Sequence, residues 1–168
     1  MRQAVFMSLA VACFATQLRA AEPVTGGGLK SVLPAGWQTG TAAAGELALS
    51  ESAGPARVRA CRLARKTAAN PAQWARAYVK YFVEGEGRKA LVAGVEPKRV
   101  AGKLGATAAF SAEKPGGDAK ADKIWQRLYV IPSKEADQVI VVICTAPSKE
   151  FRKYAKAFDQ ILDALEEQ

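Results

Sequence analysis

The stretch "VIVVICTAPSKEFRKY", residues 139–154, joins an apolar run to a cysteine, a Thr-Ala-Pro turn and a charged segment. The side chains of a strand alternate between the two faces of its sheet. One face would carry Val139, Val141 and Ile143, and the other Ile140, Val142 and Cys144. Because both sets are apolar, both faces must be covered. We expect a central strand over 138–145, since an edge strand this apolar would invite aggregation.

The segment after this strand, residues 147–166, has the period of an amphipathic helix. Its apolar face is formed by Phe151, Tyr154, Phe158, Ile161, Leu162 and Leu165. Pro147 suits the first turn. The charges run against the helix macrodipole, with Lys149, Arg152, Lys153 and Lys156 early and Asp159, Asp163, Glu166 and Glu167 late. Such an order marks either a surface kept for a partner or ordinary solvent-exposed charge.

A second helix is expected to begin at Asn70. This residue can cap the helix, Pro71 fits its first turn, and Gln73 completes the spacing of a capping box. An aromatic stripe follows at helical spacing, formed by Trp74, Tyr78, Tyr81 and Phe82. We expect this stripe to pack in the core and the helix to end at Gly85.

Alternating segments and turn signals predict the strands. They fall near 29–37, 46–52, 56–65, 96–101, 105–112, 123–131 and 138–145. The last of them read as an antiparallel meander, with one helix before it and one after it. We therefore predict an α/β fold of the α+β type, with a mainly antiparallel sheet of about six strands flanked by helices on both faces.

Residues 1–20 have the pattern of a secretory signal peptide, with Arg2 ahead of an apolar run over 4–15 and a cleavage position near Ala20. The run is shorter than the about 20 residues that a membrane span needs. An uncleaved anchor and a lipoprotein modified at Cys13 are the alternatives. Residues 21–28 contain three consecutive glycines and predict a flexible lead-in, followed by a single domain over 29–168. We expect an exported, periplasmic protein.

The chain is basic, with 24 Lys and Arg against 16 Asp and Glu and a net charge of +8. This balance favours acidic partners or surfaces. The candidate partner-binding residues are Arg57, Arg59, Arg62, Arg65 and Lys66 in an acid-free stretch, with Arg152, Lys153 and Lys156 in the final helix. The expected partner is another envelope protein with an acidic surface. Anionic lipid is an alternative, and an exported chain is not expected to meet nucleic acid.

Several kinds of chemistry lack their usual residues. The chain has no histidine, which removes Ser-His-Asp and Cys-His catalysis and the commonest metal ligand. No phosphate-binding loop of the G-x-x-x-x-G-K-[ST] type occurs. We therefore expect no catalytic residues, no metal site, no cofactor and no enzyme activity.

Two cysteines, Cys61 and Cys144, lie in predicted strands after the leader. An exported chain with this pattern invites a disulfide between them. The bridge requires the two Cα atoms to lie within about 7 Å of each other. If their strands are not suitably placed, both thiols are simply buried. A reactive role for Cys144 is the weakest alternative, because no histidine is present to lower its pKa.

Two motifs resemble those of the PsbP/DcrB/Mog-like superfamily. They are "LPAGW" at 33–37, and "VVICTAP" at 141–147 followed after Ser148 by "KEFRKYAKAFDQILDALE" at 149–166. The resemblance spans most of residues 29–166. It implies an antiparallel sheet between helices and a protein that binds other molecules rather than an enzyme. It carries no shared catalytic motif onto this chain.

These observations together predict a non-catalytic periplasmic accessory or binding protein that acts through a protein–protein surface. One alternative is a carrier of a small amphiphilic ligand, held between sheet and helix beside Trp74 and Tyr78. Another is an immunity protein against a periplasmic toxin. The sequence leaves the partner and the oligomeric state open.

Overall fold

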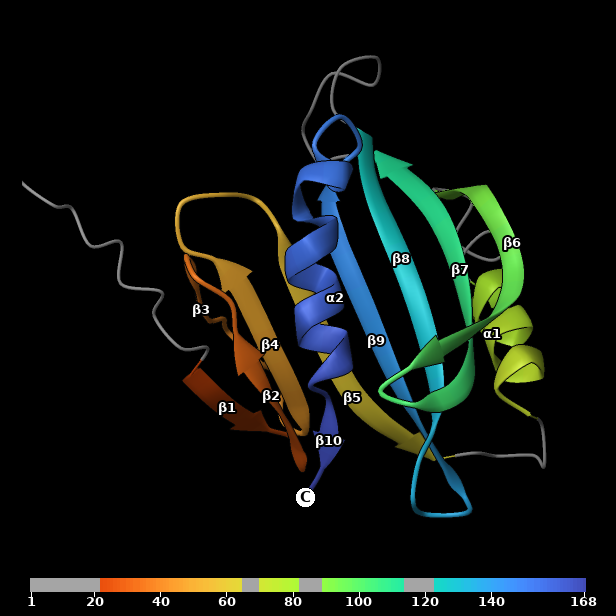
Figure 1. The fold of residues 1–168 in the computed structure, drawn as a ribbon. Coiled ribbons are helices and arrows are strands. Elements are labelled where there is room, and N and C mark those ends of the chain that lie inside the picture. Colours follow the sequence, from red (N-terminus) through yellow and green to blue (C-terminus); the bar gives the residue numbers. More distant parts are fainter. Residues whose placement is uncertain (1–21, 65–69, 82–88, 114–122) are drawn as a thin grey trace, which may run out of the picture.

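The computed structural model describes residues 22–64, 70–81, 89–113 and 123–168, and every element below lies within these ranges (Figure 1). The predicted signal peptide, and the candidate residues Arg65 and Lys66, lie outside them. Among the described residues, no helix is long and apolar enough to cross a membrane.

Most of the chain forms one antiparallel sheet of seven strands, in the order β3-β4-β5-β9-β8-β7-β6. The strands are β3 (Trp37–Thr39), β4 (Glu46–Glu51), β5 (Arg57–Ala64), β9 (Gln138–Pro147), β8 (Lys123–Pro132), β7 (Lys103–Glu113) and β6 (Lys89–Val100). A second sheet of three strands has the order β1-β2-β10. It contains β1 (Glu22–Gly26), β2 (Leu29–Leu33) and β10 (Glu166–Glu167). The mainly antiparallel α+β fold is confirmed, but the expected count of about six strands was too low.

Strand β9 lies in the middle of the large sheet, between β5 and β8, and both of its faces are covered. Its residues Ile140, Val142 and Cys144 belong to one buried apolar cluster, and Val139 and Val141 belong to another. Helix α2 (Ala155–Asp163) contributes to the first cluster and helix α1 (Pro71–Lys80) to the second. We call the two sides of the large sheet the α2 face and the α1 face.

The two faces are covered unequally. The α2 face carries α2, and the small sheet contributes Val24 and Leu29 to the same apolar cluster. Helix α1 packs against β6, β7 and β8. In Figure 1 it lies behind the strands on the right, and no helix of the described segments lies behind β3, β4 and β5. The α1 face of the large sheet therefore has a covered half and an open half.

Helix α1 begins where the sequence places it. The Asn70 side chain accepts a hydrogen bond from the Gln73 backbone at 2.9 Å, and the Gln73 side chain accepts one from the Asn70 backbone at 3.1 Å. This reciprocal capping box satisfies two backbone N–H groups of the first turn. Trp74 and Tyr78 stack at 5.3 Å between ring centroids and pack against the α1-face cluster. Both side chains are partly buried, whereas Tyr81 of the expected stripe is 64% exposed and Phe82 lies outside the described residues, so only part of the stripe packs against the core.

The final helix is shorter than expected. Pro147 does not start it, because Pro147 pairs with Ile124 at the end of β9 and the Ser148 N–H continues the ladder to Lys123 at 2.9 Å. A 3-10 helix, Phe151–Tyr154, then leads into α2. At the other end, Glu166 and Glu167 leave the helix and pair with β2 as strand β10. The two glutamates thus lie outside the helix, which removes part of the reversed charge order.

Residues 22–28 of the glycine-rich lead-in form a strand and a turn, where the sequence had predicted a flexible segment. Residues 22–26 form β1, which pairs with β2 along its whole length. Gly27 and Gly28 make the turn between them with φ of 59° and 72°, a left-handed conformation that glycine adopts without strain. A Cβ atom at Gly27 would also clash with the backbone of Gly45. These glycines therefore form a tight turn against the β4 end of the large sheet.

The possible disulfide between the two cysteines is not formed. Cys61 and Cys144 are both free, although their strands β5 and β9 are neighbours. Cys61 pairs in register with Val141 and packs on the α1-face cluster, whereas Cys144 pairs with Val58 and lies in the α2-face cluster. The two thiols therefore point to opposite sides of the sheet. A bridge here requires neighbouring strands, and β5 and β9 are neighbours. Their register, however, places the two side chains on opposite faces of the sheet.

Thiol labelling without reductant tests this placement. We expect iodoacetamide to modify Cys61 slowly in the folded protein, because partial burial and the nearby Glu46 charge raise the pKa of its thiol. Cys144 is fully buried, which raises the pKa of its thiol further, and it should react only after denaturation. Peptide mass mapping measures both. A Cys61–Cys144 peptide without any label after denaturation would contradict the register.

Candidate protein-interaction face

The open half of the α1 face presents polar side chains of β3, β4 and β5. Register pairs Gln38 with Ser50, Ser50 with Arg57, and Ala48 with Arg59, so these residues share one side of the sheet. On the other side, Leu47, Leu49 and Val58 are buried beneath α2 and the small sheet. Alternation along these strands thus directs the apolar residues inward and both arginines outward. We call the surface formed by Gln38, Ala48, Ser50, Arg57 and Arg59 the arginine face.

A depression of about 630 Å³ lies over the arginine face. Small residues line much of it, namely Gly40, Ala42, Ala43, Ala48, Ser50 and Gly54. Arg57 and Arg59 line it as well. The surface is therefore concave, and its largest polar side chains are two guanidinium groups.

The two arginines differ in their partners. Arg59 donates from Nε to Glu46 Oε2 at 3.1 Å and makes a second, shorter contact to the same oxygen through Nη2. That oxygen also accepts from the Ala43 backbone at 3.3 Å, so Glu46 fixes both the Arg59 side chain and the loop beside it. An exposed pair of this kind contributes only about 0–1 kcal/mol, and its main effect here is on position. Among the described residues, no ion pair is formed by Arg57.

The other candidate residues lie elsewhere. Arg62 is on the α2 face, where a Cβ atom at Gly28 would clash with its guanidinium group. Arg152, Lys153 and Lys156 are exposed on the 3-10 helix and α2, and Lys153 lies over the Tyr154 ring at 4.9 Å. The structure therefore brings together Arg57 and Arg59, and it places the helical cations on the opposite side of the sheet.

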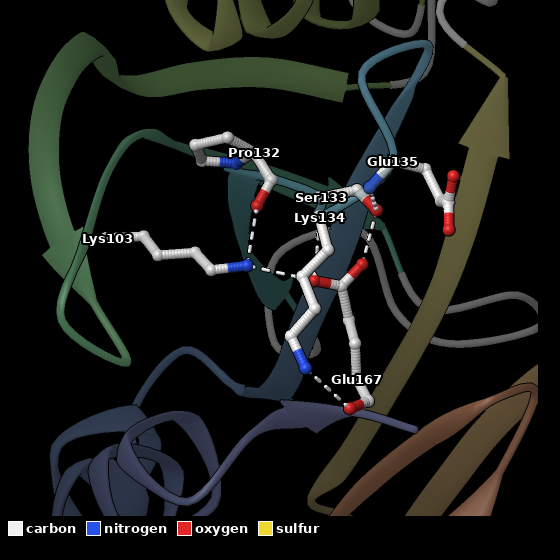
Figure 2. Close-up of polar contacts among 6 residues, drawn as sticks. All are labelled: Lys103, Pro132, Ser133, Lys134, Glu135 and Glu167. Carbon is white, nitrogen blue, oxygen red and sulfur yellow. Dashed lines mark hydrogen bonds and ion pairs between the residues drawn. The ribbon is translucent and has the colours of Figure 1, made fainter.

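A second polar cluster lies at the C-terminal end of β8, beside β10 of the small sheet (Figure 2). The Glu167 carboxylate accepts hydrogen bonds from Lys103 Nζ at 2.9 Å, from the Lys134 backbone at 2.8 Å, and from the Ser133 hydroxyl. Lys103 also donates to the Pro132 carbonyl at 3.1 Å, and Lys134 Nζ donates to the Glu167 carbonyl at 3.1 Å. This cluster, the Glu167 clamp, joins β10 to the start of β7 and to the turn after β8.

The Glu167 clamp is built for a charged carboxylate. The Glu167 side chain is only 3% exposed. Burial alone would raise the pKa of Glu167, but the hydrogen bonds from Lys103, Ser133 and the Lys134 backbone outweigh it, and the pKa lies below its usual range. The chain itself thus supplies the hydrogen-bond donors that this carboxylate needs. We read the clamp as a structural element and the arginine face as the candidate site.

Sequence reasoning placed Glu167 on the polar face of a helix and missed the clamp. The available signal was the charge order, since acidic residues at a helix C-terminus are disfavoured by the macrodipole. A tertiary partner for Glu167 explains that order without an external partner. Glu166 makes a weaker contact of 4.0 Å with Lys30.

Metal-binding chemistry has little support in the described segments. No group of three or more His, Cys, Asp or Glu side chains there could hold a metal ion. The aromatic pair expected beside a carried ligand, Trp74 and Tyr78, packs against the core cluster under α1. The depression over the arginine face is therefore the candidate binding surface.

The substitution Glu167→Gln tests the clamp. It removes the charge that three donors share, and we expect it to lower the free energy of unfolding by about 2 kcal/mol at neutral pH. The pKa of Glu167 in the folded protein lies below its unfolded value of about 4.3. The stabilisation by the charged carboxylate is therefore fully present above about pH 4.3. It is lost as the pH falls through the folded-state pKa, so wild type and variant should converge in acid.

Urea unfolding at several pH values measures this difference. Glu166→Gln is the matched control, since Glu166 is exposed and its pair with Lys30 should contribute less than about 0.5 kcal/mol. Equal stability of Glu167→Gln and wild type at pH 7 would show that the clamp does not hold β10.

Comparisons with known proteins give the fold. No protein-family model and no curated protein sequence matches the chain. Solved structures do match. The Saccharomyces cerevisiae Ran-binding protein Mog1p has a TM-score of 0.58 at 11% identity, covering 88% of this chain and 96% of Mog1p. Cyanobacterial PsbP from Synechocystis has a TM-score of 0.59 at 11% identity, covering 94% of this chain and 98% of PsbP.

A third match is LpqN, described as involved in cell envelope biogenesis of Mycobacterium tuberculosis. It has a TM-score of 0.51 at 17% identity and covers 89% of this chain and 86% of LpqN. All three cover nearly the whole described chain at low identity. They confirm the fold that the two motifs implied, and they do not by themselves assign an activity.

Proposed function

We propose that this chain, which has the fold shared by PsbP and Mog1, is a non-catalytic accessory protein that binds another protein through the arginine face. The observation that carries the proposal is the unequal cover of the sheet. Helix α1 packs over β6, β7 and β8, while Arg57 and Arg59 lie in a concave surface on the other half of the same face. A concave surface with fixed charges is suited to recognition of a partner of opposite charge.

The similar proteins support a binding role by analogy. One is described as binding Ran and another as involved in cell envelope biogenesis. At identities of 11% and 17% they share the fold alone, and function must be argued from the site. The partner of this chain is therefore identified by its chemistry. Positive charge on the arginine face favours an acidic protein surface.

The site of action proposed is the bacterial cell envelope, with export directed by residues 1–20. Arg2, the apolar run over 4–15 and the cleavage position near Ala20 support export. An exported protein meets envelope proteins and membrane surfaces, so an anionic membrane is the main competing target of the same cations. The test below separates the two.

Site-specific photo-crosslinking in the native cell tests the proposal. A photoreactive amino acid is placed at Gln38, which is exposed on the arginine face, or at Gln160, which is exposed on α2. We expect a discrete protein adduct from Gln38, because a bound partner covers this surface, and no adduct from Gln160. Denaturing gels followed by mass spectrometry identify the adduct.

The control is the double change Arg57→Glu and Arg59→Glu in the Gln38 crosslinking variant. Reversing both charges should abolish the adduct while leaving the far-ultraviolet circular dichroism spectrum unchanged, since both side chains are exposed. Adducts from Gln160 alone would assign binding to the helical cations Arg152, Lys153 and Lys156 instead. Crosslinking to lipid but not to protein would also overturn the proposal.

A further inference from the structure

The proposed function leaves the nature of the partner open, and the inference here rests on it. We infer that the arginine face recognises an extended acidic segment of the partner whose carboxylates occur at alternate positions. Arg57 and Arg59 would each hold one carboxylate. Three observations carry this inference: the spacing of the arginines, the distribution of the acids, and the lining of the depression.

The spacing of the arginines follows from β5. Arg57 and Arg59 are two positions apart on one strand and point to the same side, so their Cα atoms are about 7 Å apart at the usual rise of a strand. An extended peptide lying along β5 repeats its side chains on one side at the same interval of about 7 Å. Acidic residues at positions i and i+2 of such a peptide therefore match the two guanidinium groups.

Of the two acids near the arginines, Glu46 and Glu51, neither forms an ion pair with Arg57. Glu46 binds Arg59 through a single oxygen, which leaves Nη1 of Arg59 without a hydrogen bond to the described residues. Glu51 lines the depression, but it faces the α2 side with its carboxylate beside Gly54 and Tyr154. Arg57 forms no ion pair with a described residue. Arg57 therefore retains a positive charge that a partner carboxylate can neutralise.

The small residues that line the depression favour an extended peptide as the bound segment. Gly40, Ala48 and Gly54 have small side chains or none, so a backbone can approach the sheet closely. Ser50 lies between the arginines and the edge strand, where its hydroxyl can bind a peptide carbonyl or N–H group. Arginine suits this role because its planar guanidinium binds a carboxylate through two parallel hydrogen bonds. A helix, about 10 Å in diameter, could not bring its backbone as close to these small residues.

The test compares two synthetic nonapeptides of identical composition, four Glu and five Thr. In one the glutamates alternate with threonine, and in the other they are contiguous. We expect the full chain to bind the alternating peptide about fivefold more tightly, since only that peptide places both carboxylates on one side of an extended backbone. Fluorescence anisotropy of labelled peptides at low ionic strength measures the dissociation constants.

Substitutions assign the binding to the two arginines. Arg57→Gln should weaken binding of the alternating peptide about tenfold, as expected for loss of one bidentate charged contact. Arg57→Lys should recover only part of that loss, because lysine keeps the charge without the planar fork. Arg152→Gln is the matched control, since Arg152 is exposed on the 3-10 helix at the opposite side of the sheet. It should leave binding unchanged.

Misfolding could also explain a loss of peptide binding in the arginine variants. A variant that is expected to bind more tightly controls for this. Glu46→Gln keeps an oxygen for Arg59 and the Ala43 backbone but removes the competing charge. It should tighten binding of the alternating peptide about threefold, because one negative charge near the arginines is lost. Misfolding would not produce such a gain.

The outcomes separate this inference from the proposed function. Equal affinity for the two peptides, or equal loss in Arg57→Gln and Arg152→Gln, would overturn the inference. If Gln38 still gave a protein adduct in the cell, the proposed function would stand without it. Binding to phosphatidylglycerol vesicles that needs Arg57, with no binding of either peptide, would assign the arginines to a membrane surface and overturn the inference. Inhibition of peptide binding by millimolar phosphate would do the same by showing a site for small anions.

Discussion

The two-sided burial of β9 is the constraint on which the rest of the structure depends. A strand with apolar residues at successive positions cannot face water on either side, so the sheet that contains it needs a layer on each face. The α2 layer receives Ile140, Val142 and Cys144, and the α1 layer receives Val139 and Val141. Because α1 is ten residues long and packs on β6, β7 and β8, no helix of the described segments covers β3, β4 and β5 on the α1 face.

Because α1 covers only part of this face, charged residues can occupy the remaining part. On β5 the residues that face α2 are Val58 and Ala60, both buried, whereas the residues on the other side are Arg57 and Arg59. The same alternation that builds the core thus gathers charge on the open half. Glu46 then fixes Arg59 and the adjacent loop together. The polar contacts around Glu167 have a different role, because there the chain satisfies its own charges and secures β10.

Local patterns in the sequence were sufficient for several elements. The capping box at Asn70 and the apolar alternation of β9 depend on residues close together in the chain. Other features depend on distant partners. Pro147 belongs to β9 because Ile124 pairs with it, Glu167 leaves the helix because Lys103 and Ser133 hold it, and the cysteines stay apart because register places them on opposite faces. Because both faces of β9 are apolar, its periodicity does not show which face lies on the same side of the sheet as Cys61.

We propose that a partner in the envelope covers the open half of the sheet. Arginine-selective labelling with phenylglyoxal, compared between intact envelopes and the purified protein, measures this cover directly by peptide mass spectrometry. The account predicts several-fold lower modification of Arg57 and Arg59 in the envelope, with Arg152 modified equally in both preparations. Equal modification of Arg57 in the two preparations, or protection of Arg152 alone, would contradict it.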